Sequence, residues 1–147
     1  EWWALGLVGA RPAHDKKKGA DTGIDGYINF FDDSSDNAKI IIISVKGGHV
    51  TVSQIRDLKG VLEREKATIG VLITLQEPTR PMLEEAATAG IYTPEYFPDK
   101  HYPKLQIITI EELFNGKQIE YPRIAPEATF KKAERKYKEE GNQTSLL

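Results

Sequence analysis

Apolar and polar residues follow one another in short runs along this chain, and the runs predict a series of strands and helices. Two runs rich in β-branched and aromatic residues, 23–31 and 40–48, are separated by the polar cluster 32–37, a pattern typical of a hairpin. Residues 69–75 form a continuous apolar run of strand length, which predicts a strand buried on both faces. Residues 105–108 predict one further short strand.

Helical spacing appears between the predicted strands. Thr51 and Gln54 have the form of a capping box. The apolar residues that follow recur with the period of a helix: Val52, Ile55, Leu58, Val61 and Leu62. Residues 80–89 predict a second long helix that ends at Gly90.

Shorter elements complete the pattern. Residues 1–8 predict the last turns of a helix that ends at Gly9, and Thr109 begins a brief helix with Glu112 in the capping-box position. Residues 91–104 contain three prolines and are expected to be irregular.

The order of these elements predicts an α/β fold. A hairpin followed by a helix, a buried strand, another helix and a last strand implies a mixed central sheet flanked by helices on both faces. We expect residues 1–125 to form this single domain. Residues 126–147 are expected to be a basic, flexible tail, because residues 131–138 hold five basic residues against one acid and the segment has no apolar stripe.

Composition narrows the class of protein. A chain of 147 residues with 39% hydrophobic and 29% charged residues suits one globular domain. It has no cysteine, so disulfides and thiolate metal sites are excluded, and a cytoplasmic location is expected. No apolar run approaches the roughly 18 residues of a membrane span, and no secretory leader is visible, so a membrane is not expected as a partner. The net charge of −2 leaves attraction to nucleic acid to local patches.

Candidate chemistry lies at the ends of the two hairpin strands. Asp25 stands near the start of the first strand, and Lys46 ends the second, just before Gly47 and Gly48. An acid and a lysine at the ends of neighbouring strands can face one small volume, where they could hold a metal and polarise a phosphate. The alternatives are a turn residue for Asp25 and a solvated strand-end lysine for Lys46.

This layout resembles the PD-(D/E)XK nucleases. Residues 18–26 and 44–48 are similar to the Mrr-like restriction endonuclease branch of that superfamily and to domains at the C-terminal end of bacterial DNA methyltransferases. The resemblance covers residues 1–121 and implies a restriction-endonuclease-like core. Ser44 departs from the pattern, because the position two before the lysine is normally Glu, Asp or Gln.

The resemblance implies a DNA endonuclease of a restriction-modification protein that depends on Mg²⁺, with Mn²⁺ as a substitute. Asp25 would be the central metal ligand and the carbonyl of Val45 a second one. Lys46 would orient or deprotonate the attacking water, or stabilise the charged phosphate. Ser44 would form a hydrogen bond or hold a metal-bound water.

Further site residues also follow from the resemblance. Glu1 falls where family members carry an additional acid on the first helix, and Gln54 would be a polar contact as well as a helix cap. Lys16, Lys17 and Lys18, together with His49, are candidates for phosphate contacts, with a solvated loop as the alternative. Asp21 is interpreted as a loop residue, with a carboxylate near the metal as the alternative.

Two other functions remain open from the sequence. Because Ser44 removes an expected carboxylate, the chain could be a catalytically weakened DNA-binding module of a methyltransferase. The other is an α/β interaction domain without a nucleic-acid role. The partners that the interpretation allows are DNA, a fused methyltransferase domain and a second copy in a homodimer. Because the chain begins at Glu1 without a methionine, we expect it to be part of a larger protein.

Overall fold

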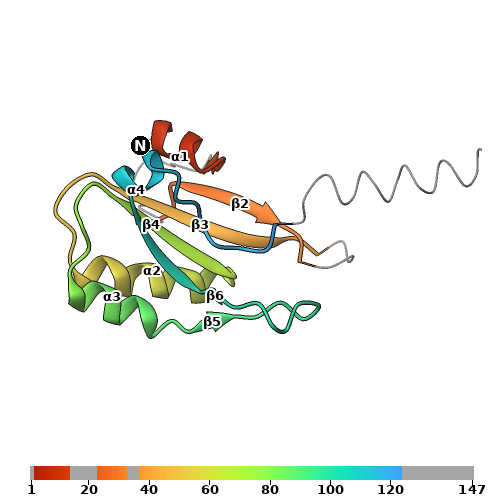
Figure 1. The fold of residues 1–147 in the computed structure, drawn as a ribbon. Helices are drawn as coiled ribbons and strands as arrows, with labels where there is room; N and C mark the ends of the chain where they lie inside the picture. Colours follow the sequence, from red (N-terminus) through yellow and green to blue (C-terminus); the bar gives the residue numbers. More distant parts are fainter. Residues whose placement is uncertain (1, 14–22, 33–36, 124–147) are drawn as a thin grey trace, which may run out of the picture.

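The computed structural model describes residues 2–13, 23–32 and 37–123 of the chain (Figure 1). Its elements follow one another as α1 (Trp2–Leu7), β1 (Arg11–Pro12), β2 (Gly26–Phe30), β3 (Lys39–Lys46), α2 (Val52–Glu65), β4 (Ile69–Thr74), α3 (Arg80–Ala87), β5 (Ile91–Tyr92), β6 (Tyr102–Pro103), β7 (Leu105–Thr109) and α4 (Ile110–Phe114). No helix within these ranges is both long and apolar enough to cross a membrane.

Five strands form the central sheet in the order β1-β2-β3-β4-β7. The predicted hairpin is present, with β2 antiparallel to β3 and Tyr27 opposite Ile42. β3 and β4 are parallel, as are β4 and β7, because a helix crosses over between the members of each pair. The mixed sheet predicted from the order of elements is therefore confirmed.

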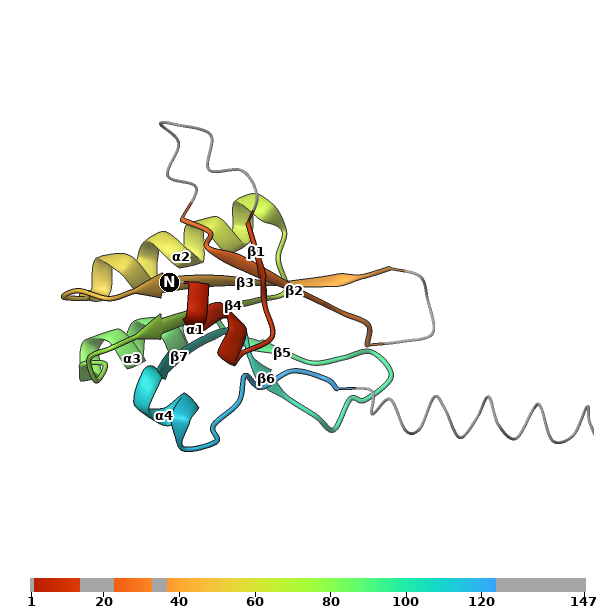
Figure 2. The same ribbon diagram turned by 90° about the horizontal axis from the view of Figure 1, so that it is seen from above.

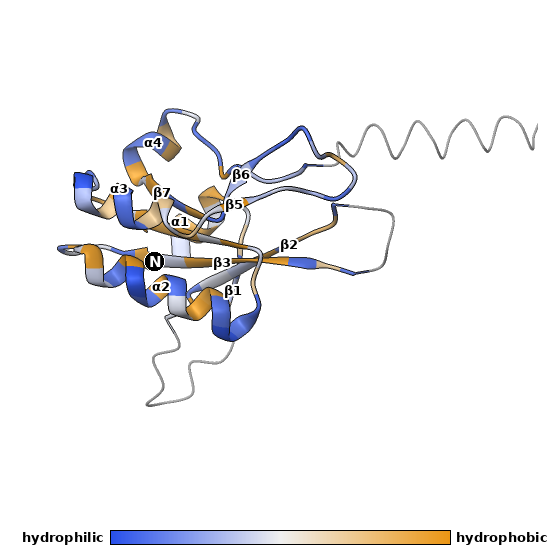
Figure 3. Ribbon diagram, turned by 90° about the horizontal axis from the view of Figure 1, so that it is seen from below, coloured by the Kyte–Doolittle hydropathy of each residue, from blue (hydrophilic) through white to orange (hydrophobic). Residues whose placement is uncertain are grey.

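Helices cover both faces of the sheet. α2 and α3 lie along one face, and α1 and α4 lie on the other, as Figures 1 and 2 show from two directions. Alternation along β3 divides its side chains between the two cores: Ile42 packs in the core with α2 and α3, whereas Ile41 and Ile43 pack in the core with α1 and α4. In Figure 3, hydrophobic and hydrophilic residues are interspersed along α2, as expected of a helix with one buried side.

The predicted helix caps are also present. The capping boxes at Thr51 and Thr109 are complete, with Gln54 and Glu112 bonding back to the cap residues. Gly90 has a φ of 89°, as expected of a glycine that follows the end of a helix.

Residues 91–104 differ from the prediction of irregular structure. They contain the antiparallel pair β5–β6, in which Tyr92 lies opposite Tyr102 and Ile91 opposite Pro103. The three prolines hide this pairing, but a proline is tolerated on an edge strand. Tyr92 fixes the pair to the sheet, since its hydroxyl donates to Asp32 and its ring contacts Phe30 edge-on.

The chain after α4 returns to the sheet and closes the core beneath α1 and α4. The Gln106 side chain donates to the carbonyl of Glu120 at 2.7 Å and accepts from its N–H at 2.9 Å. Ile119, the residue before Glu120, is 3% exposed, and the centroid of the Tyr121 ring lies 5.5 Å from that of the Phe30 ring. This segment is therefore part of the folded domain, while the predicted tail 126–147 lies outside the described residues.

Candidate functional site

An open groove of about 580 Å³ lies between α2 and the end of β3. Its polar lining comprises Ser44, Lys46, Gln54, Arg56, Asp57 and Arg64, and Leu58 and Val61 add apolar surface. Three of the residues predicted from the sequence, Ser44, Lys46 and Gln54, therefore line one groove.

The pleat of β3 brings Ser44 and Lys46 to this groove. Side chains two apart on a strand share a face, so these two follow Ile42 on the face covered by α2. Ser44 is 4% exposed, whereas Lys46 is only partly buried. Within the ranges that the structure describes, the Lys46 side chain has no hydrogen-bond or ion-pair partner. A lysine in this position offers three N–H donors to a bound anion.

Asp25 lies beside the groove but is not among the residues that line it. Its carboxylate accepts the backbone N–H of Val45 at 2.7 Å, and its own N–H donates to the carbonyl of Ile43 at 2.9 Å. Its carbonyl accepts the N–H of Ala13 at 3.0 Å. Just before β2 begins, Asp25 therefore connects β3 with the segment that follows β1. One of its carboxylate oxygens accepts a hydrogen bond from β3.

The described residues supply only part of the metal site that the resemblance implies. Mg²⁺ requires near-octahedral oxygen ligands, usually including carboxylates. No cluster of three or more His, Asp or Glu side chains in the described ranges could hold a metal ion. Ser44 supplies a neutral hydroxyl where the family has an acid. Glu1 and Asp21 lie outside the described residues.

Gln54 combines two of the predicted roles. Its Oε1 atom accepts from the N–H of Thr51 at 2.7 Å, so the side chain caps α2, and the residue also lines the groove. His49 is exposed and does not line the groove. Lys16, Lys17 and Lys18 lie outside the described residues.

Three groove residues, Arg56, Asp57 and Arg64, were missed from the sequence. Their positions on α2 resemble the solvated face of an amphipathic helix, and only the docking of α2 on β3 brings them into the lining of the same groove as Lys46. The arginines recur eight residues apart, which places them on one side of the helix, and that spacing is the signal that could have identified them.

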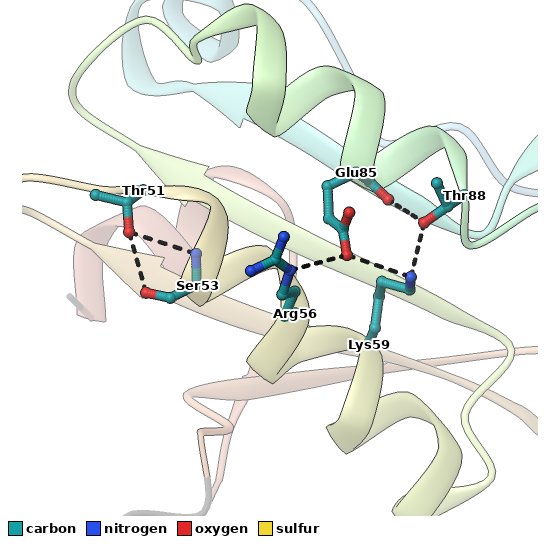
Figure 4. A network of polar contacts seen from close by, with 6 residues as sticks. All are labelled: Thr51, Ser53, Arg56, Lys59, Glu85 and Thr88. Carbon is teal, nitrogen blue, oxygen red and sulfur yellow. Dashed lines mark hydrogen bonds and ion pairs between the residues drawn. The ribbon is translucent and has the colours of Figure 1, made fainter.

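Arg56 belongs to a network that joins α2 to α3 (Figure 4). Its Nε lies 3.3 Å from an oxygen of Glu85, and the Lys59 ammonium lies 3.6 Å from the same oxygen. Lys59 also donates to the hydroxyl of Thr88 at 2.7 Å. Glu85 therefore offsets part of the positive charge on α2 and holds the Arg56 side chain by its Nε atom.

Comparison with known families gives one match that spans most of the chain. A family model described as NACHT-associated inactive Restriction Endonuclease 1 matches residues 3–115. The matched range runs from α1 to just beyond α4, so it includes the whole sheet and the groove. No curated protein sequence matches the chain.

Proposed function

Because the chain belongs to the family of NACHT-associated inactive restriction endonuclease domains, we propose that it binds DNA through the groove and does not cleave it. The restriction-endonuclease-like fold supplies the binding surface in this proposal. In this proposal, the replacement of one expected acid by Ser44 weakens the metal site and leaves the phosphate-binding part of the groove in place.

The observation that carries the proposal is Lys46 beside Ser44. In a site with an acid at position 44, a lysine two residues away would share its charge with a carboxylate and a metal. With Ser44 there, Lys46 stands in the groove without an anionic partner among the described residues. Such a lysine attracts phosphate oxygens, and a neutral hydroxyl beside it can add a hydrogen bond.

The metal-dependent DNA endonuclease is the second candidate. It is favoured by the position of Asp25 and Lys46 at the ends of paired strands, as in the PD-(D/E)XK motif. Asp25 and the Val45 carbonyl would hold Mg²⁺ in that case, and carboxylates from outside the described residues would have to complete the site. The geometry of the described part favours binding over cleavage.

The family description also bears on partners. It refers to NACHT association, and we propose that this chain works with a NACHT protein, in place of the methyltransferase fusion expected from the sequence. A homodimer and a restriction-modification context remain proposals with less support.

One titration tests both candidate functions. Fluorescence anisotropy with labelled DNA in EDTA should show binding that weakens with salt, and Lys46→Ala should weaken it roughly threefold to tenfold and lower the salt slope by about one. Lys39→Ala is the matched control, because Lys39 is at the other end of β3 and does not line the groove. The DNA should stay intact when Mg²⁺ or Mn²⁺ is added.

Each alternative has its own outcome. An absence of DNA binding by the unmodified protein would overturn the proposal. Metal-dependent cleavage that Lys46→Ala abolishes would establish the endonuclease instead.

A further inference from the structure

Gly60 stands in the interior of α2, where glycine weakens a helix relative to alanine. Packing among the described residues does not explain it, because a methyl group placed on Gly60 would meet no atom of that part of the chain within 4 Å. Gly70 is different, because a methyl group there would lie 2.9 Å from the Leu62 side chain. Gly60 also does not have the positive φ that favours glycine elsewhere in the described chain. Among the described residues, its presence therefore needs a reason other than packing or backbone conformation.

The surroundings of Gly60 indicate what that reason is. Gly60 lines the groove, and the arginines that also line it, Arg56 and Arg64, lie four residues before and after it. At a rise of 1.5 Å per residue, these arginines are about 12 Å apart along the helix axis. Gly60 lies midway between them and has no side chain, while Asp57, Leu58 and Val61 also line this part of the groove. Each is held through its Nε atom, Arg56 by Glu85 and Arg64 by Glu65, both at 3.3 Å.

We infer that α2 seats the sugar–phosphate backbone of a DNA strand, with Arg56 and Arg64 contacting phosphates and the strand lying against the helix at Gly60. The inference rests on the proposed function and specifies how the groove binds. Glycine is the residue that lets a ligand approach a backbone closely. Any side chain at position 60 would stand between the two arginines and hold the strand away from them.

Two substitutions at position 60 separate this role from a purely structural one. Gly60→Ala and Gly60→Gln should both raise the melting temperature, because both residues favour a helix more than glycine does. Both should nevertheless weaken DNA binding, with the larger glutamine reducing affinity by about tenfold. A glycine without a binding role would give the rise in melting temperature alone.

The matched control is Gly6→Ala in α1. A methyl group at Gly6 also meets no atom within 4 Å, and Gly6 is helical and does not line the groove. This variant should leave DNA affinity unchanged. Single-stranded and duplex forms of the labelled DNA are titrated in parallel, and the form on which Gly60→Gln loses affinity is the one that α2 seats.

The outcomes distinguish this inference from the proposed function. If the unmodified protein binds DNA and Gly60→Gln binds single-stranded and duplex DNA with the same affinities as the unmodified protein, the inference is overturned and the proposed function stands. If the unmodified protein binds neither form, the proposed function fails and the inference fails with it.

Discussion

Asp25 forms hydrogen bonds within the sheet, at the position where a nuclease would have a metal-binding carboxylate. Its carboxylate accepts the Val45 N–H, its N–H donates to Ile43, and its carbonyl accepts the Ala13 N–H. These bonds tie together the parts of the chain that border the groove. A retained acid at this position is therefore explained by the fold alone, without catalysis.

Substitution of Asp25 should change stability. Asp25→Ala leaves the Val45 N–H without its acceptor and should lower the free energy of unfolding by about 1–2 kcal/mol. Asp25→Asn keeps an oxygen that can accept this N–H, so its loss should be smaller. Urea unfolding followed by circular dichroism measures both variants, and equal stability of Asp25→Ala and the unmodified protein would rule out the structural role.

The sequence identified part of the site for a physical reason. Lys46 is predicted from its place at the end of a strand, and the site roles of Ser44 and Gln54 are what the resemblance to the nuclease motif implies. Their presence in one groove agrees with strand alternation and with the capping box, which are local relations within a few residues. The bond from Val45 to Asp25 depends on the register of β2 against β3, and the contribution of Arg56 and Arg64 depends on how α2 docks. The spacing of the two arginines places them on one side of α2, but the register of β2 and the surface that this side of α2 faces are tertiary relations that spacing does not give.

Among the elements, α4 shows most clearly how a short helix is fixed. Its Glu112 carboxylate accepts from the Lys117 ammonium at 2.7 Å and from the N–H of Thr109 at 3.0 Å. The bond from Lys117, followed by that from Thr109, lowers the pKa of Glu112 below its ordinary value of 4.5. Since the folded pKa is the lower one, the charged carboxylate stabilises the fold above the unfolded pKa, and this stabilisation is lost as the pH falls through the folded pKa.

A pH series on Glu112→Gln tests this linkage. Glutamine can still cap Thr109 but has no charge for Lys117, so the variant should melt at a lower temperature than the unmodified protein near pH 7. The difference should shrink as the pH falls below about 4.5. Glu111→Gln is the control, because the Glu111 side chain has no such partners among the described residues, and a difference that stays constant with pH would contradict the assignment.

The elements were predicted well where their signals are local. The hairpin, the buried β4 and both capping boxes follow from patterns within each segment. The β5–β6 pair was missed because its support comes from Asp32 and Phe30, about 60 residues earlier in the chain. Short strands held by distant contacts leave no periodic pattern of their own.

For the whole molecule, the sequence predicted the α/β class, the mixed sheet and a restriction-endonuclease-like family, and these are confirmed. The Mrr-like branch and the methyltransferase context are not confirmed, and nuclease activity also stays a prediction. Fold class follows from the order of elements, whereas activity depends on a few side chains such as Ser44.

The predicted tail and the segment before it should differ in their effect on stability. Deleting residues 131–147 should leave the melting temperature within a few degrees, because that segment lacks an apolar stripe. Deleting everything from residue 117 onward should cost more than about 3 kcal/mol, because it removes the buried Ile119 and both hydrogen bonds of the Gln106 amide to Glu120, leaving only its bond to the Pro103 carbonyl. Thermal unfolding of the two truncated proteins measures this, and a large loss from the shorter deletion would mean that the tail packs on the domain.

The parallel ladders of the sheet also determine the order in which the chain can fold. β2 and β3 are close in sequence, so their ladder can form as a local contact. Partners in the parallel ladders are far apart, 28 residues from Ile41 to Ile69 and 35 from Gly70 to Leu105, and loops of that length must close before those contacts form. β4 can pair with both β3 and β7 only after these two long loops have closed. The hairpin that carries Ser44 and Lys46 therefore needs the smallest loop closure of the three ladders, whereas β4 and β7 join the sheet only at a larger cost in chain entropy.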